Sequence, residues 1–165
     1  MKQIRKNTFE TNSSSTHSVS ICNKVEPQKY DTTLDYDPGD NKVHCRFGEF
    51  GWEQDAFRDA QTKLNYLVTM IAQFEGLSIW CSAPWDEYTL NERLMESEDF
   101  QKLNDIIEYE YRCRLWVDSS QGYIDHQSYE YYNCIQDFLN DWGIDSMEDF
   151  IFNSKVILHT DNDNH

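Results

Sequence analysis

Residues Gln54–Phe74, QDAFRDAQTKLNYLVTMIAQF, carry a regular apolar pattern that sets the framework of the fold. Apolar side chains recur there at spacings of three and four residues, as on one face of an α-helix. They are Phe57, Ala60, Leu64, Leu67, Val68 and Ile71. Asp55 and Asp59 lie near the start, where the helix dipole favours negative charge, and Gly76 follows the end as a stop signal. The pattern predicts one amphipathic helix over Gln54–Phe74.

Three segments precede this helix. His17–Cys22 alternates apolar and polar residues, with Val19 and Ile21 on one face, and predicts a short strand. Asn23–Asn41 holds two prolines and a turn-like DPGD sequence, so we expect a long surface loop with room for a short strand. Val43–Phe50 alternates again and predicts a second strand that pairs with another one.

The segments that follow the helix mix both element types. Leu77–Cys81 is a short apolar run typical of a buried strand. Ser97–Cys113 has a capping serine, an acidic first turn and helical apolar spacing, and it predicts a second helix. Leu115–Asp118 and Gly122–Gln127 flank a Ser-Ser-Gln-Gly sequence and are interpreted as a β-hairpin.

The C-terminal third predicts three more elements. A helix spans Tyr129–Trp142 with Gly143 after its end, a short helix begins after Ser146, and Lys155–Asp161 is the last strand. We therefore expect one globular domain over residues 1–165, of the α+β class, with a frayed tail at 161–165. Its expected architecture is a single small antiparallel or mixed sheet with about three to four helices packed on one face.

Composition limits the classes of partner. Thirty acidic and fourteen basic residues give a formal charge of −16. Such a charge repels phosphate backbones and anionic lipids, so direct binding to nucleic acid or membrane is disfavoured. An acidic surface either serves solubility or mimics nucleic acid in the basic groove of another protein. The five cysteines are an odd number without C-x-x-C spacing, and the N-terminus resembles no signal peptide. These features favour a reducing cytoplasm.

The run RKNTFETNSSSTHS at residues 5–18 holds the candidate chemistry. A catalytic interpretation assigns Ser15 as nucleophile, His17 as base and Glu10 as the group that orients it. A ligand-binding interpretation uses a turn-rich anion site, for which the candidates are Asn12, Ser13, Ser14 and His126. A third interpretation is a hydrogen-bonded turn that locks the N-terminus onto the sheet. The histidine spacing matches no metal motif, no metal ligand is assigned, and no cofactor is indicated.

The same run carries a resemblance. The opening M-K-x-I-R-x-x-x-F-E-T-N-S-S-S-T-H-S resembles a family of uncharacterised bacterial and bacteriophage proteins that begin with nearly this string. The match covers Ile4–Ser18, with weaker echoes at Gly122–Ser128 and Phe150–Asn164, and Asn23–Glu98 adds nothing to it. The resemblance implies a phage-associated protein in the host cytoplasm and implies no catalytic residues.

Two segments alternate tyrosine with glutamate and predict a protein-binding surface, since Tyr buries a large area at low entropy cost. The candidate residues are Glu108, Tyr109, Glu110, Tyr111, Tyr129, Glu130 and Tyr131. The first functional hypothesis is therefore a phage-associated acidic accessory protein that binds and modulates a host protein, as an inhibitor in counter-defence or as a nucleic-acid mimic. The alternative is a small enzyme or ligand-binding module built on the N-terminal Glu/Asn/Ser/His motif.

Overall fold

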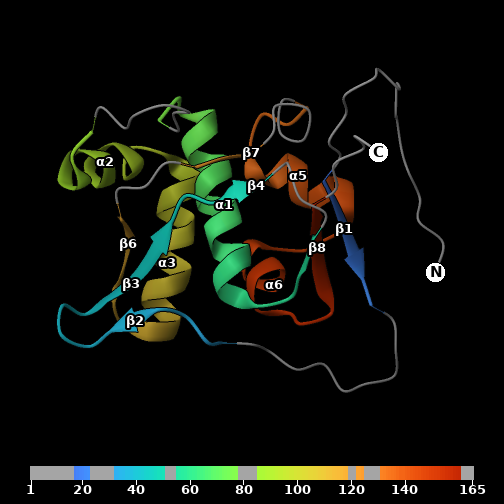
Figure 1. Ribbon diagram of the computed structural model, residues 1–165, viewed down its shortest axis with the longest axis horizontal. Helices are drawn as coiled ribbons and strands as arrows, with labels where there is room; N and C mark the ends of the chain where they lie inside the picture. The colour runs from blue at the N-terminus through green and yellow to red at the C-terminus, as the bar shows by residue number, and fades with distance from the viewer. Residues whose placement is uncertain are drawn as a thin grey trace.

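The computed structural model describes residues 17–22, 32–50, 55–77, 85–118, 122–124 and 131–160. These residues form five helices and eight short strands in a mixed order, which confirms the α+β class (Figure 1). The elements are β1 Ser18–Ile21, β2 Tyr36–Asp37, β3 Lys42–Arg46, β4 Glu49–Phe50, β5 Asp55–Phe57, α1 Ala60–Phe74, α2 Glu87–Leu94, α3 Glu98–Tyr111, β6 Arg114–Asp118, β7 Tyr123–Ile124, α5 Ile135–Trp142, α6 Met147–Phe152 and β8 Val156–Thr160.

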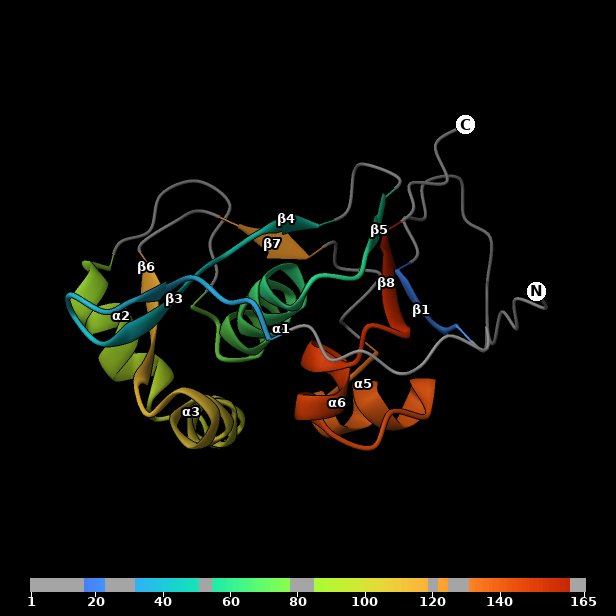
Figure 2. The same cartoon turned by 90° about the horizontal axis from the view of Figure 1, so that it is seen from below.

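The described strands form three small sheets, and the prediction of a single sheet was wrong. One sheet has the order β1-β8-β5 and is antiparallel, the second has the order β2-β3-β6, and the third pairs β4 with β7. Figure 2 looks along α1, with the first sheet on one side of this helix, the second on the other and the β4–β7 pair above it. The expected stack of helices on one sheet face is thus replaced by a helix between sheets.

The predicted β-hairpin is also wrong, because its two strands pair with different partners. β6 lies parallel to β3, with Lys42 opposite Arg114, and β7 lies parallel to β4, with Glu49 opposite Tyr123. The paired residues are 72 positions apart in sequence in the β3–β6 pair and 74 positions apart in the β4–β7 pair. β6 and β7 therefore each run in the same direction as the strand they pair with, and they are not paired with each other as in a hairpin.

Helix α1 begins later than its apolar pattern predicts. Asp59 is the N-cap, and its Oδ1 accepts a hydrogen bond from the Thr62 N–H at 2.7 Å. The residues before it, Asp55–Phe57, form strand β5 against β8. The predicted stop is confirmed, since Gly76 has a φ of 67°, a left-handed conformation in which a Cβ atom costs energy.

A polar stripe on α1 supplies hydrogen bonds to the neighbouring strands. Its members follow one another at four-residue spacing and so lie along one edge of the helix; they are Gln61, Asn65, Thr69 and Gln73. Gln61 Nε2 donates to the His44 carbonyl at 3.0 Å, and Asn65 Oδ1 accepts from the Arg46 N–H at 3.1 Å. Thr69 Oγ1 accepts from the Gly48 N–H at 3.0 Å. These side chains thereby satisfy backbone N–H and C=O groups along β3 and just after it that the short strand β2 does not reach.

Two side-chain amides, one on α1 and one on α2, each form a pair of hydrogen bonds with the backbone of one strand residue. Gln73 both donates to the Ile124 carbonyl, at 2.8 Å, and accepts from the Ile124 N–H, at 2.7 Å. Asn91 of α2 does the same to Val117 of β6, at 2.8 and 2.9 Å. Each side-chain amide thus replaces one residue of a missing neighbouring strand and covers an edge that would otherwise be open to pairing.

The remaining helices agree in part with their predictions. α3 begins after Ser97 as predicted, and α6 begins after Ser146, whose Oγ accepts from the Asp149 N–H at 3.0 Å. α5 starts at Ile135, several residues after the predicted start, and ends at Gly143 as predicted. The sequence analysis missed α2. The predicted strand at 77–81 lies outside the described residues except for Leu77, which is buried in irregular structure.

The core is one hydrophobic cluster that encloses α1. Tyr66 of α1 is fully buried, and its ring contacts Phe50, Phe138 and Phe150, with centroids 5.0, 5.9 and 6.4 Å away. Lys63, one turn earlier, is also fully buried and donates from Nζ to the carbonyls of Asn153 and Val156 at 3.0 and 3.4 Å. The ammonium group therefore lies at the C-terminal end of α6, where the helix dipole favours a cation.

Candidate functional site

Most of the predicted N-terminal site lies outside the described residues. This applies to Glu10, Asn12, Ser13, Ser14, Ser15 and His126. His17 is described, and it is a buried residue whose Nδ1 lies 3.2 Å from the Tyr66 hydroxyl. Burial raises the pKa of the Tyr66 phenol, so this phenol stays protonated at neutral pH. His17 is thus in contact with the aromatic core, while its catalytic role stays a prediction.

A different serine and histidine approach each other on the opposite face of the same sheet. Ser18 is opposite His159 in the β1–β8 register, so His17, one residue earlier, points to the other face from His159. Ser20 Oγ lies 2.7 Å from His159 Nε2. A hydroxyl next to an imidazole is the first requirement of a serine nucleophile. The predicted orienting carboxylate, Glu10, was assigned to His17 and lies outside the described residues.

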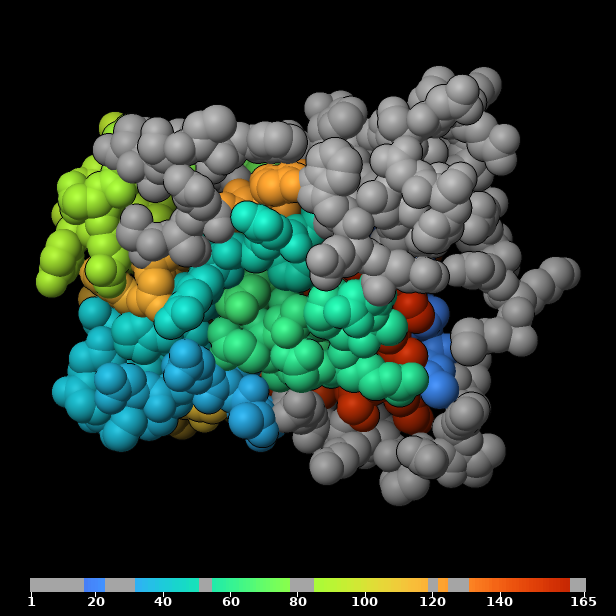
Figure 3. Space-filling model, viewed as in Figure 1, coloured from blue at the N-terminus to red at the C-terminus, as the bar shows by residue number. Residues whose placement is uncertain are grey.

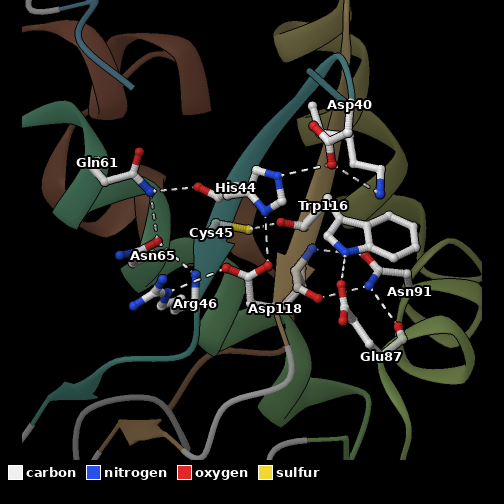
Figure 4. A network of polar contacts seen from close by, with 12 residues as sticks. Asp40, His44, Cys45, Arg46, Gln61, Asn65, Glu87, Asn91, Trp116 and Asp118 are labelled. Carbon is white, nitrogen blue, oxygen red and sulfur yellow. Dashed lines mark hydrogen bonds and ion pairs between the residues drawn. The ribbon is translucent and has the colours of Figure 1, made fainter. Parts of the chain in front are cut away.

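The densest polar arrangement lies on the outer face of the β3–β6 pair (Figure 4). Strand alternation buries Val43, Cys45, Leu115 and Val117 on the inner face. The outer face therefore carries the other residues of the two strands, namely Lys42, His44, Arg46, Arg114, Trp116 and Asp118. The sequences KVHCR and RLWVD show this alternation, but they do not reveal that the two strands are neighbours.

His44 lies between two carboxylates at the centre of this face. Its Nδ1 is 2.9 Å from Asp118 Oδ1, and its Nε2 is 3.2 Å from Asp40 Oδ2. The hydrogen bond to Asp118 has the largest effect and raises the pKa of His44; burial, next in size, lowers it, and the charges of both carboxylates and the hydrogen bond to Asp40 add to the rise. The imidazole is thus stabilised as a cation that links the β2–β3 turn to β6.

Further ion pairs extend from the two carboxylates. Arg46 Nε lies 3.4 Å from Asp118 Oδ2, and Lys42 Nζ lies 3.4 Å from Asp40 Oδ2. Desolvation acts to raise the pKa of Asp40, but hydrogen bonding and charge from Lys42 and His44 together lower it. The lowered pKa keeps Asp40 ionised at neutral pH.

Trp116 forms one wall of the arrangement. The Lys42 ammonium lies over its ring, 3.6 Å from the centroid, and Tyr88 of α2 meets it edge-on at 5.5 Å. The indole N–H donates to Glu87, also on α2. Cation–π and hydrogen-bond contacts thus fix the indole and connect α2 to the sheet.

The predicted partner-binding residues separate into two places. Tyr131 is 78% exposed and precedes α5, whose Ile135 N–H donates to Asp99 at the start of α3. Tyr109 is 72% exposed near the other end of α3, about 15 Å away at 1.5 Å per residue. Tyr129 and Glu130 lie outside the described residues. Tyr109 and Tyr131, the two most exposed of the described candidates, therefore lie near opposite ends of α3.

At the C-terminal end of α3 the predicted residues differ in exposure. Glu108, Tyr109 and Glu110 are exposed. Tyr111 turns inward instead, with its ring 6.5 Å from that of Phe152 and its hydroxyl donating to the Thr32 carbonyl. Three of the four residues in this cluster are thus available to a partner.

The described cysteines include two that are buried, Cys45 and Cys113. The four that are described, Cys22, Cys45, Cys113 and Cys134, are free thiols. Burial raises the pKa of Cys45 well above its ordinary value, with a smaller effect from the charge of Asp118, so the thiol is not a nucleophile at neutral pH.

Comparison with family models, with curated proteins and with solved structures gives no match to this chain. Within the described ranges, no helix has the length and apolar character needed to cross a bilayer.

Proposed function

We propose that this chain is an acidic binding protein that attaches to a basic protein through one end of α3. We call this surface the α3 acidic end and define it as Asp105, Glu108, Tyr109 and Glu110, all exposed. In line with the resemblance at the N-terminus, the partner is a host protein and the chain is a phage-associated accessory factor. Its mode of action is to occupy a basic groove that otherwise holds nucleic acid.

The observation that carries this proposal is an electrostatic conflict in α3. The C-terminal end of a helix is its negative pole, where acidic side chains are destabilising. Glu108 and Glu110 lie in this last turn, which contains no basic residue. Neither glutamate forms an ion pair within the described part of the chain; Arg112, the next cation, lies over the Tyr109 ring at 5.8 Å. A surface that opposes helix stability in this way is typical of a functional site.

The chemistry of the α3 acidic end fits lysine- and arginine-rich partners. Its carboxylates attract cations over a distance, and the overall charge of −16 adds to this attraction and speeds encounter. The exposed Tyr109 ring carries the chain's own Arg112 guanidinium 5.8 Å from its centroid, and a partner cation that displaced it would gain the same cation–π energy. Tyrosine flanked by acids thus combines electrostatic steering with a hydrophobic contact.

Charge reversal tests the proposal. The variant Glu108→Lys/Glu110→Lys should lose most of the proteins that the wild-type chain captures from bacterial lysate, a reduction of about tenfold or more for two reversed contacts. Captured proteins should elute with rising salt, because screening weakens charge attraction. If a captured protein binds nucleic acid, duplex DNA should displace it from the wild-type chain.

The matched control is Glu75→Lys/Glu92→Lys, which changes the net charge equally at two exposed positions on α1 and α2. It should retain capture. Equal loss in both variants would mean that capture depends on net charge alone and not on the α3 acidic end. Unchanged capture by the α3 variant would refute the proposal. Circular dichroism on each variant separates a lost contact from a lost fold.

A further inference from the structure

The turn between β2 and β3 brings three metal-binding side chains together. One ligand atom each from Asp37, Asp40 and His44 lies within 4.8 Å of the other two. The two carboxylates are exposed and the imidazole is half-buried. In Figure 3 the blue to cyan segment that contains this turn lies at the surface, and both carboxylates are exposed, so an ion from solution can reach them.

The backbone of the turn is held in place before any ion binds. Asp37 Oδ1 accepts from the Gly39 N–H at 2.6 Å, and the Asp37 carbonyl accepts from the Asn41 N–H at 2.9 Å. Asn41 has a φ of 58° and also accepts from the Tyr36 hydroxyl at 3.0 Å. A turn fixed at both ends lowers the entropy that its side chains lose when they chelate an ion.

A separate element orients the imidazole toward the two carboxylates. Asp118 belongs to β6, 74 residues away in sequence, and its Oδ1 binds His44 Nδ1 at 2.9 Å. This contact leaves Nε2 facing Asp40, as Figure 4 shows. A histidine that binds a metal through one nitrogen usually gives its other N–H to a carboxylate, which fixes the ring and raises its basicity. Asp118 occupies the position of that second carboxylate.

We propose that Asp37, Asp40 and His44 form a binding site for a divalent transition-metal ion of the zinc type, with Asp118 as the residue that positions His44. One imidazole nitrogen and two carboxylate oxygens suit Zn²⁺, with water in the remaining position. Two carboxylates also balance the charge of a dication. Mg²⁺ and Ca²⁺ prefer oxygen ligands throughout and should bind more weakly.

His44 Nε2 and Asp40 Oδ2, 3.2 Å apart, already have about the spacing of two metal ligands, whereas the three ligand atoms together lie within 4.8 Å of one another. Metal–ligand distances of about 2.0–2.2 Å place tetrahedral ligands about 3.4 Å apart. Side-chain rotation in Asp37 and Asp40 can close that gap, because both are exposed. The ion must also displace the proton on His44 Nε2, because only the neutral imidazole binds a metal, and the Lys42 ammonium, which lies 3.4 Å from Asp40 Oδ2. Lys42 is therefore a competitor of the metal, and its removal should strengthen binding.

Titration calorimetry of the metal-free full chain with Zn²⁺ tests the site. Asp40→Asn and His44→Asn should each weaken binding about tenfold or more, and the positioning variant Asp118→Asn should weaken it about 10–100-fold. Lys42→Met should strengthen it. Asp35→Asn is the matched control, since Asp35 is an exposed acid on the same segment outside the cluster.

Two further readouts address competing explanations. Co²⁺ as a probe should give a visible spectrum without a thiolate charge-transfer band, which separates this site from the cysteines. Excess Mg²⁺ should leave Zn²⁺ binding in place. Absence of Zn²⁺ binding by the wild-type chain, unchanged binding in both Asp40→Asn and His44→Asn, or a thiolate band would each overturn the proposal. None of these outcomes depends on the α3 acidic end.

Discussion

Asn91 is the residue whose side chain does most to protect the second sheet. Its amide is almost completely buried and binds both the N–H and the carbonyl of Val117 at the free edge of β6. Asn104 of α3 extends this protection, since its Oδ1 accepts from the Leu115 N–H at 3.0 Å. A hydrogen bond adds only a modest net free energy to the fold, whereas a buried backbone group left without a partner is strongly destabilising. Removal of either side chain is therefore expected to cost more than the hydrogen bonds themselves contribute.

Asn91→Ala should therefore lower the free energy of unfolding by about 2–3 kcal/mol, the cost of two unsatisfied buried groups. Urea unfolding at neutral pH measures the change. Asn140→Ala is the control, because Asn140 is exposed and its side chain hydrogen-bonds only to Gln136 in the described residues, and it should stay within about 0.5 kcal/mol of wild type. Similar values for the two variants would show that Asn91 does not replace a strand.

Sequence patterns predicted the surroundings of a residue correctly only where its neighbours in space are also its neighbours in sequence. The acids and tyrosine of the α3 acidic end are exposed as expected, because helical spacing separates them from the apolar face. His44 escaped notice, since its partner Asp118 comes from a strand 74 residues later and no local pattern records that contact. The metal-ligand cluster was missed for a related reason, since Asp37 and Asp40 look like ordinary turn residues.

At the scale of elements, helix ends were the most predictable feature. Gly76, Gly143 and Ser146 all mark the ends that the sequence assigns to them, because capping involves residues only a few positions apart. Strand pairing was not predictable. β5 shares its residues with the start of an apparent helical pattern, and the partners of β6 and β7 lie more than 70 residues away.

The N-cap of α2 makes helix stability depend on pH. Asp86 accepts from the Thr89 N–H at 3.1 Å and from its hydroxyl at 2.8 Å, and these hydrogen bonds, the first above all, lower the pKa of Asp86 against a small effect of desolvation. A carboxyl with a lowered folded-state pKa stabilises the fold above its unfolded value, near 3.8, and this stabilisation disappears as the pH falls through the folded-state pKa.

Asp86→Asn should thus be less stable than wild type at pH 7, because asparagine caps the helix but lacks the charge that favours its N-terminus. The difference should shrink as the pH falls below about 3.8 and through the lower folded-state pKa of Asp86, where the wild-type carboxyl gains its proton. Thermal unfolding across this range measures both proteins. Ser146→Ala removes a cap without an ionisable group and should give a difference independent of pH. A constant difference for Asp86→Asn would contradict the assignment.

At the scale of the whole molecule, the acidic excess acts against the fold. Ion pairs in the described residues are few and mostly exposed, and exposed pairs contribute little to stability. The hydrophobic cluster around α1 must therefore offset the repulsion that remains among the acidic side chains. The charge that we propose for partner attraction therefore reduces the stability of the free protein, and a bound basic partner would relieve that cost.

Salt should consequently stabilise the free protein. Raising NaCl from about 20 to about 200 mM shortens the screening length from roughly 20 Å to below 10 Å and weakens repulsion among the surface acids, so the urea midpoint should rise. Glu75→Lys/Glu92→Lys reduces the formal charge from −16 to −12, since each substitution adds two positive units, and its midpoint should depend less on salt. An unchanged or falling wild-type midpoint would mean that attractive pairs outweigh repulsion. In that case, relief of charge repulsion could not contribute free energy to the binding of a basic partner.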